Sequence, residues 1–193
     1  SAGAVRALRM AKGRPDTQPF TVHLGRASDY RRFVSAPSPI ARRLVRKCWP
    51  GPLTLICDEP EPAATEIGRE LTETQRAEVY HGGTVGLRFP AHPVAERLLS
   101  AVEQPVVASS ANRAGNPPPL TAESAITELG DCAAFVFDAG RTQYSESSTI
   151  VRVGGDGWKI ERSGVLDERT IHRLARSEFL FVCTGNTCRS PMA

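Results

Sequence analysis

The stretch TVGLRFPAHPVAERLLSAVEQPVVASS at residues 84–110 carries the pattern that decides the fold. Its first residues alternate apolar with small or polar side chains, as expected of a β-strand. Pro93 then opens an amphipathic helix over residues 93–102, because a proline costs least in the first turn, where its missing N–H would have no partner. Residues 106–110 read as a second, buried strand that runs into a turn. Strand, helix and strand in succession predict the α/β class.

The same alternation continues on both sides of this stretch. Further helices are predicted over residues 4–11, 40–49, 121–129 and 167–176, and further strands over residues 20–24, 52–57, 134–138, 149–153 and 158–162. The last two strands are joined by Gly-Gly-Asp-Gly and form a hairpin, so the sheet cannot be wholly parallel. We therefore expect a twisted mixed β-sheet with flanking helices.

Composition excludes several classes of protein. The chain has 193 residues, of which 40% are hydrophobic, so it can bury a core, and it holds no apolar run near the ~20 residues that a membrane span needs. No secretory signal opens it, and its five cysteines are scattered without metal-ligand spacing, which favours the reducing cytoplasm and predicts no metal site. The net charge is only +3, but 21 of the 24 basic residues are arginine, whose planar fork suits phosphate and carboxylate.

Two short polar clusters could hold such anions. Lys12 and Arg14 stand two residues apart after the first helix and could hold a polyphosphate, although the same cations could simply favour a helix terminus. Ser109, Ser110 and Asn112 follow a strand, where α/β sheets bind ligands, but the same residue types also build ordinary turns. Each cluster alone leaves both readings open.

Six motifs in fixed order decide between these alternatives. They are Lys-Gly-Arg-Pro, Trp-Pro-Gly-Pro-Leu-Thr, Val-Gly-Leu-Arg-Phe-Pro-x-His-Pro, Ser-Ser-Ala-Asn-x-x-Gly, Ser-Thr-Ile-Val and Arg-Ser-Gly, spread over residues 1–166. Together they resemble the threonylcarbamoyl-adenylate synthase family, the YrdC-like domain. The resemblance implies a domain over residues 1–176 that condenses L-threonine, bicarbonate and ATP into threonylcarbamoyl-AMP and pyrophosphate for the modification of tRNA. Possible partners are tRNA itself and the threonylcarbamoyl transferase complex.

The resemblance also implies roles for individual residues. Residues matching the ATP contacts of the family are Lys12, Arg14, Thr84, Asn112 and Arg162. Residues matching its threonine contacts are Arg88, Ser110 and Ser148, with Arg88 as the clamp on the threonine carboxylate. The chemistry needs two anions held together and water excluded, so no side-chain nucleophile and no tightly bound cofactor is expected, and Mg²⁺ would arrive with ATP.

The chain departs from the family at its beginning. The Pro-Thr-x-Thr-x-Tyr-Gly-Leu segment of the family, which supplies a strand and part of the threonine site, does not occur in this sequence. The sheet is therefore expected to lack a strand and the chain as given to lack turnover.

The tail, residues 177–193, carries a different pattern. Its string Val-Cys-Thr-Gly-Asn-Thr-Cys-Arg-Ser-Pro looks like the phosphate loop of low-molecular-weight protein tyrosine phosphatases, in which Cys183 would be the nucleophile, Arg189 the phosphate fork and Ser190 a donor to the thiolate. The rest of such a domain does not occur in the sequence, so this loop is expected to be inactive.

Structural or solvent-exposed roles are expected for the remaining polar residues. The four histidines His23, His81, His92 and His172 have no ligand spacing. Arg42, Arg43, Arg46 and Lys47 form a charged helix face that is expected to be solvated, with RNA contact as the alternative.

Two other functions remain open at this point. A module that binds RNA on a basic face without catalysis would show a steep salt dependence of binding. A carbamoyl-adenylate-forming domain of the hydrogenase-maturation type shares the fold and would not depend on threonine.

Overall fold

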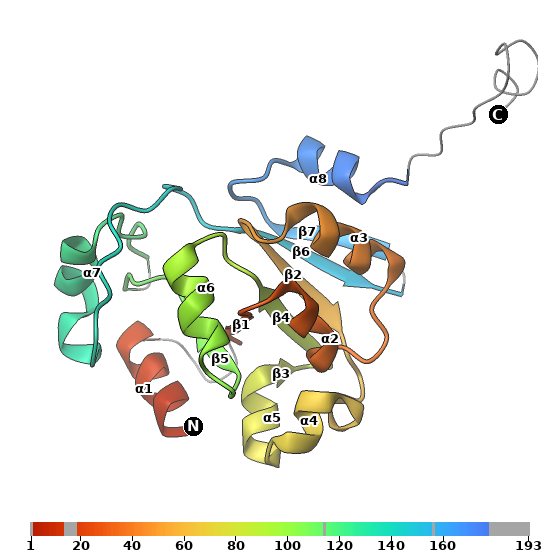
Figure 1. The fold of residues 1–193 in the computed structure, drawn as a ribbon, viewed down its shortest axis with the longest axis horizontal. Helices are drawn as coiled ribbons and strands as arrows, with labels where there is room; N and C mark the ends of the chain where they lie inside the picture. The colour runs from red at the N-terminus through yellow and green to blue at the C-terminus, as the bar shows by residue number, and fades with distance from the viewer. Residues whose placement is uncertain (1, 14–18, 114, 156, 178–193) are drawn as a thin grey trace, which may run out of the picture.

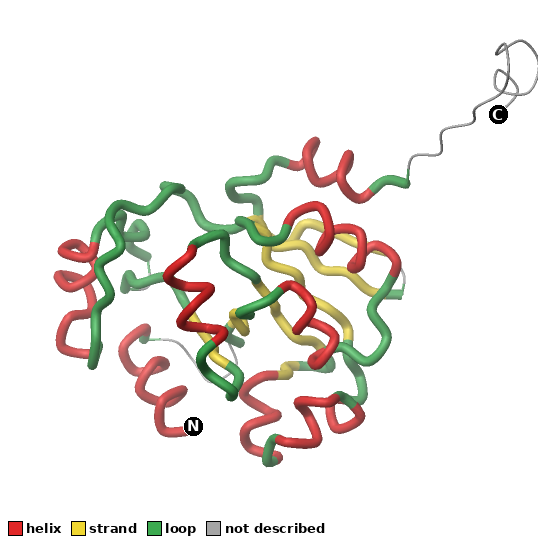
Figure 2. The backbone as a smooth tube through the Cα atoms, viewed as in Figure 1, coloured by secondary structure: helices red, strands yellow, loops and turns green. Residues whose placement is uncertain are grey.

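The computed structural model describes residues 2–13, 19–113, 115–155 and 157–177 (Figures 1 and 2). Arg14 and the phosphate-loop residues Cys183, Arg189 and Ser190 lie outside the described residues. In chain order the helices are α1 (Ala2–Lys12), α2 (Tyr30–Phe33), α3 (Pro39–Cys48), α4 (Glu66–Glu70), α5 (Glu73–Val79), α6 (Pro93–Ser100), α7 (Ala122–Leu129) and α8 (Glu168–Ala175). The strands are β1 (Thr21–His23), β2 (Leu53–Asp58), β3 (Tyr80–His81), β4 (Thr84–Arg88), β5 (Val106–Ala108), β6 (Thr149–Gly154) and β7 (Gly157–Arg162).

The strands form one mixed sheet in the order β5-β1-β4-β2-β6-β7, with β3 paired to β4 off this path. β1 runs parallel to β4 and β2 runs parallel to β6, whereas the other neighbours are antiparallel. The predicted twisted mixed sheet with flanking helices is confirmed.

One face of the sheet carries the core. Val22, Leu87, Leu55 and Val151 are partners across four neighbouring strands, and each is 0% exposed. Residues in register share a face of the sheet, so these four form a continuous apolar row. Helices α2, α3 and α8 lie along this part of the sheet (Figure 1), and their buried side chains belong to the same cluster as the row. These helix residues are Tyr30, Phe33, Ala41, Leu44, Val45, Cys48, Ile171 and Ala175.

The part of the molecule around β5 has a much thinner core. α6 and α7 contain no buried residue, and all three residues of β5 are only partly buried. Residues 134–138, predicted to form a strand, are not a strand in the structure, and Phe135 and Phe137 in this segment are 84% and 64% exposed. The apolar pattern is that of a strand, but no described strand pairs with this segment, and backbone pairing is what makes a strand.

Between Asp58 and Tyr80 the sequence analysis predicted no element, and the structure shows two short helices there. α4 begins after Thr65, whose hydroxyl accepts from the Gly68 N–H at 2.9 Å. α5 begins with a reciprocal cap in which Thr72 and Gln75 each accept from the backbone N–H of the other. The spacing Thr-x-x-Gln is a signal of a helix start that the sequence contained.

Trp49 and the cations of α3 pack against the rest of the fold. Trp49 is 7% exposed, with its indole N–H donating to the Leu53 carbonyl at 2.8 Å. The charged side chains of α3, predicted to be solvated, are so only in part. Arg43 donates to the Ala175 carbonyl, and Lys47 donates to the Leu174 carbonyl at 3.3 Å, so both stabilise the free carbonyls at the end of α8.

Across the described ranges, no helix has both the length and the apolar character that a bilayer crossing requires.

Candidate functional site

Opposite the helix-covered face, the sheet carries a second row that is polar. Arg88 on β4 is in register with His23 on β1 and with Thr54 on β2. All three side chains therefore point away from the apolar row, to the face that we call the open face. The Thr54 hydroxyl lies 2.8 Å from the hydroxyl of Ser148, the residue before β6. We call Arg88, Thr54, His23, Ser148 and Arg162 the Arg88 cluster.

Two arginines of the cluster, Arg88 and Arg162, lie close enough to repel each other, and no ion pair to a carboxylate is formed by either of them within the described residues. Arg162, the last residue of β7, donates through Nη2 to the Ser148 carbonyl at 2.9 Å, which places its side chain beside Ser148. Burial lowers the pKa of Arg88, and the neighbouring charge of Arg162 lowers it further. The buried Nε of Arg88 has no hydrogen-bond partner among the described residues. A ligand carboxylate or phosphate would satisfy this donor and offset the repulsion between the two cations.

His23 belongs to the cluster, although the sequence analysis expected a structural role. Its Nδ1 lies 3.3 Å from the Thr21 carbonyl. Burial, together with the charge of Arg88, lowers the pKa of His23 to about 4, so the imidazole is neutral at pH 7. A neutral imidazole can donate from one nitrogen and accept at the other without adding charge beside Arg88. Only the strand order reveals this position, because His23 and Arg88 are far apart in the sequence.

A second group of predicted residues meets at the end of α1. The Lys12 ammonium, only 3% exposed, donates to the Ser110 carbonyl at 2.8 Å and to the backbone carbonyl of Asn112. Asn112 in turn donates through Nδ2 to the carbonyls of Arg113 and Asn116, at 3.0 and 2.6 Å. We call Lys12, Ser110 and Asn112 the Lys12 cluster. The structure therefore brings Lys12 together with Ser110 and Asn112, which follow it by 98 and 100 positions in the chain.

The loop of the Lys12 cluster is fixed from outside by α7. Glu128 accepts from the Arg113 N–H at 2.9 Å and from the Asn116 side-chain amide, and these bonds lower the pKa of Glu128. Beside this cluster the hydroxyl of Ser109 is buried without a hydrogen-bond partner among the described residues. A buried unpaired hydroxyl next to a buried lysine is what a polar ligand would satisfy.

Thr84 is not part of either cluster. It begins β4, and its hydroxyl donates to the His81 carbonyl at 2.8 Å. Because Thr84 and Arg88 are four residues apart on one strand, they share the open face about 13 Å apart. The last residue of β5, Ala108, pairs with Thr21, the first residue of β1. Ser110 and Asn112 come after Ala108, so they lie beyond the N-terminal end of β1. The Lys12 cluster and the Arg88 cluster thus occupy different ends of the sheet.

In the described part of the chain, no three histidine, cysteine, aspartate or glutamate side chains gather where they could hold a metal ion. The expectation that Mg²⁺ would arrive with the nucleotide stays a prediction.

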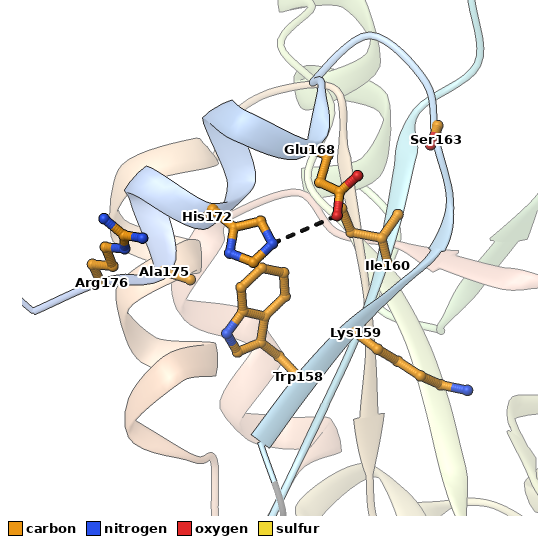
Figure 3. Close-up of a pocket in the computed structure, with 8 residues that line it drawn as sticks. All are labelled: Trp158, Lys159, Ile160, Ser163, Glu168, His172, Ala175 and Arg176. Carbon is orange, nitrogen blue, oxygen red and sulfur yellow. Dashed lines mark ion pairs between the residues drawn. The ribbon is translucent and has the colours of Figure 1, made fainter.

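A cavity of about 690 Å³ lies between β7 and α8. Trp158 and Ile160 of β7 form one side of it and α8 forms the other (Figure 3). His172 packs edge-on against Trp158, with ring centroids 4.7 Å apart, and its Nε2 lies 3.6 Å from a carboxylate oxygen of Glu168. No residue of the Arg88 or Lys12 cluster lines this cavity, and the unsatisfied donors lie elsewhere, so we place the functional site on the open face.

Comparison with known families gives one match over most of the chain. The profile of the Sua5, YciO and YrdC family, whose description is telomere recombination, matches residues 1–164.

Individual proteins resemble the chain over a similar span. A protein of Mycobacterium tuberculosis (strain H37Rv), provisionally named threonylcarbamoyl-AMP synthase, is 37% identical over 168 residues, which cover 87% of this chain and 72% of that protein. The threonylcarbamoyl-AMP synthase of Pyrococcus abyssi is 31% identical over 77% of this chain, but the match spans only 40% of that longer protein.

Solved structures agree with these matches. The crystal structure of Pyrococcus abyssi Sua5 complexed with L-threonine superposes with a TM-score of 0.76 at 27% identity, covering 89% of this chain and 47% of that one. Escherichia coli YciO shares the fold, with a TM-score of 0.61 at 21% identity.

Proposed function

Because the chain belongs to the Sua5, YciO and YrdC family, we propose that it is an L-threonylcarbamoyladenylate synthase, an enzyme that transfers the adenylyl group of ATP. Its substrates would be L-threonine, bicarbonate and ATP, and its products threonylcarbamoyl-AMP and pyrophosphate. The relative of known structure binds L-threonine, which supports the amino-acid half of this proposal.

The observation that carries the proposal is the Arg88 cluster. The half-buried Arg88, whose Nε has no partner among the described residues, and the exposed Arg162 beside it form a site for an anion. The hydroxyls of Thr54 and Ser148 add neutral hydrogen-bonding groups beside them. A free amino acid offers a carboxylate for Arg88 and an amine and a hydroxyl for such neighbours.

The Lys12 cluster would hold the second substrate. Lys12, with Arg14 two residues on, would contact the phosphates of ATP, and Asn112 would contact the nucleotide. Thr84 and Arg162 would add further nucleotide contacts, while Ser110 and Ser148 would face threonine. A buried lysine that already orders the loop of Ser110 and Asn112 needs little rearrangement when a phosphate arrives.

The chemical steps ask little of side chains. The threonine amine attacks carbon dioxide formed from bicarbonate and loses a proton, giving a carbamate. A carbamate oxygen then forms a bond to the α-phosphorus of ATP, and pyrophosphate leaves with the electron pair of the broken P–O bond. The protein contributes by holding the two anionic substrates together and by stabilising charge on the phosphates with Lys12 and the arginines. Mg²⁺ would enter with ATP, and no tightly bound cofactor is required.

The test is pyrophosphate release from the protein with ATP and bicarbonate, with and without L-threonine. Because the chain as given is expected to lack turnover, the assay is made with the Pro-Thr-x-Thr-x-Tyr-Gly-Leu segment of the family added before residue 1. For this extended chain we expect release that depends on threonine, and a product with the mass of threonylcarbamoyl-AMP. Release that is equal without threonine would contradict the proposal and favour a carbamoyl-adenylate-forming domain. Binding of RNA without pyrophosphate release, with a steep salt dependence, would favour the non-catalytic module.

The wider setting follows from the same chemistry. Threonylcarbamoyl-AMP is an activated donor, so the enzyme that consumes it must transfer the group to an acceptor, which we propose is tRNA through the threonylcarbamoyl transferase complex. The scattered cysteines and the need for ATP point to the cytoplasm.

For residues 177–193 we propose a separate role, supported only by the sequence string around Cys183. If this tail begins a phosphatase-like domain, Cys183 and Arg189 would form a phosphate-binding loop only when the rest of that domain is present. In the chain as given, alkylation of Cys183 against pH should show an ordinary thiol pKa of about 8.5. An apparent pKa below ~6 would show that the loop is already organised.

A further inference from the structure

The glycine at position 86 lies at the centre of the open face. It is the third residue of β4, a central strand paired on both sides with β1 and β2. Glycine in the interior of a strand weakens the strand, because it loses much backbone freedom on folding and packs no side chain. A glycine here must therefore be explained either by the packing and backbone of the fold or by a function of the site.

The fold itself gives no reason. A Cβ placed on Gly86 would meet the Thr21 hydroxyl at 3.6 Å, the Thr21 Cα at 3.8 Å and the Phe20 carbonyl at 3.9 Å, which are ordinary van der Waals contacts. Gly86 does not have a positive φ, unlike Gly82 and Gly83 just before it. An alanine is thus compatible with both the packing and the backbone at this position.

The position relative to the two substrate sites gives a reason outside the fold. Thr84 and Arg88 stand two residues before and two residues after Gly86, so all three point to the open face, with about 7 Å between neighbours. Thr21, which contacts the Gly86 position, is also the residue opposite the end of β5, and Ser110 and Asn112 follow β5. Gly86 therefore lies between Thr84 and the Lys12 cluster on one side and the Arg88 cluster on the other.

We propose that the reacting groups meet over Gly86, and that the missing side chain makes the space in which the carbamate oxygen approaches the α-phosphorus. This inference rests on the proposed function, in which Arg88 holds the threonine carboxylate and the Lys12 cluster holds the phosphates. The carbamate is only a few bonds from that carboxylate, so it must lie close to Arg88 on the nucleotide side. A methyl group on residue 86 would occupy this junction while leaving the ends of both substrates in contact with their own residues.

The test compares Gly86→Ala and Gly86→Ser with the unsubstituted protein, all three extended at the N-terminus by the family segment that turnover is expected to need. Gly155→Ala is the matched control, because a Cβ there meets nothing within 4 Å and Gly155 lies at the β6–β7 turn. We expect both Gly86 variants to keep or raise the melting temperature, because a strand residue other than glycine is favourable in β4. Their kcat should fall by on the order of a hundredfold, the effect of displacing reacting atoms by about 1 Å. Calorimetry should show Kd values for ATP alone and threonine alone within about threefold of the unsubstituted protein.

Three results would overturn this inference or its premise. A kcat of Gly86→Ala equal to that of Gly155→Ala would show that nothing reacts over this position. A lower melting temperature of Gly86→Ala would show that the fold requires the glycine. If the unsubstituted protein released no threonine-dependent pyrophosphate, the proposed function would itself be wrong, whereas normal release from both proteins would overturn only the role of Gly86.

Discussion

Leu87 and Arg88 are neighbours in β4, yet they belong to two different chemical environments. Leu87 is 0% exposed and lies in the apolar row between Val22 and Leu55, under the helices. Arg88 points the other way, beside Arg162, with a buried donor that no described residue satisfies. The well-packed apolar side chains of this sheet therefore lie on one face, and the polar group without a partner among the described residues lies on the other. Substitutions on the two faces should therefore have separable effects on stability and on ligand binding.

The largest effect is expected on the helix-covered face. Leu87→Ala removes buried methyl groups and leaves a cavity among the fully buried Val22, Leu55 and neighbours, so it should lower the free energy of unfolding by about 2–5 kcal/mol. Urea denaturation measures this change. A decrease in the free energy of unfolding below ~1 kcal/mol, as for an exposed residue, would contradict the conclusion that packing is concentrated on the helix-covered face.

On the open face, His23 should make stability depend on pH. Its pKa in the folded protein, about 4, lies below its ordinary value of 6.5, so the unfolded chain binds the proton first as pH falls. Stability from this group is full above pH 6.5 and is lost between pH 6.5 and pH 4, by at most about 3 kcal/mol. Denaturation midpoints of the protein and of His23→Gln over this range should differ in slope. Because the carboxylates are common to both proteins, equal slopes would show that His23 is not buried in neutral form.

Arg88→Ala should separate binding from folding. If Arg88 contacts the threonine carboxylate as proposed, its loss should weaken threonine binding by about 1.5–3 kcal/mol and abolish threonine-dependent pyrophosphate release from the chain extended by the family's N-terminal segment. The affinity for ATP should stay nearly the same, and the melting temperature should not fall, because burial and Arg162 both oppose the charge of Arg88 in the free protein. Calorimetry with each substrate checks this. If the affinities for threonine and for ATP fell together, Arg88 would be needed for folding and not for binding threonine.

The smallest effect should come from the part of the molecule without a dense core. Phe135→Ser replaces a side chain that is 84% exposed, so the free energy of unfolding should change by no more than ~0.5 kcal/mol. Ala134→Ser in the same segment is the control for the added hydroxyl. Destabilisation beyond ~1 kcal/mol would mean that Phe135 is covered in solution, and the contrast between the two parts would need revision.

Much of the architecture could be predicted because it depends on local patterns. Period-2 alternation in β4 and the Gly-rich turn before β7 are properties of short segments, and both were confirmed. The strand expected over residues 134–138 was wrong for a non-local reason, since its apolar pattern needs a partner strand that the described residues do not supply. The helices at Thr65 and Thr72 were missed because each is shorter than two full periods of an apolar stripe, although their caps were visible.

The site residues show the same limit. Resemblance to a family picked out Lys12, Asn112 and Arg88, and the structure brings Lys12 and Asn112 into contact. His23 could not be found in this way from the residue alone, because its partner Arg88 is set by the parallel pairing of β1 with β4. Sheet order is a property of the whole chain, and spacing within one segment does not encode it.

The pairing of β6 with β2, which is distant in the sequence, has a consequence for how the protein folds. The Thr54 and Ser148 hydroxyls meet although they are 94 residues apart in the chain, since β6 pairs in parallel with β2. Closing a loop of this length has an entropic cost and gives slow folding, so local helices should form before this pairing. The proposed amino-acid site would then be among the last features to form as a newly made chain folds. A partly folded chain would then contain helices but would not bind threonine. Threonine would bind only the folded chain and would stabilise it.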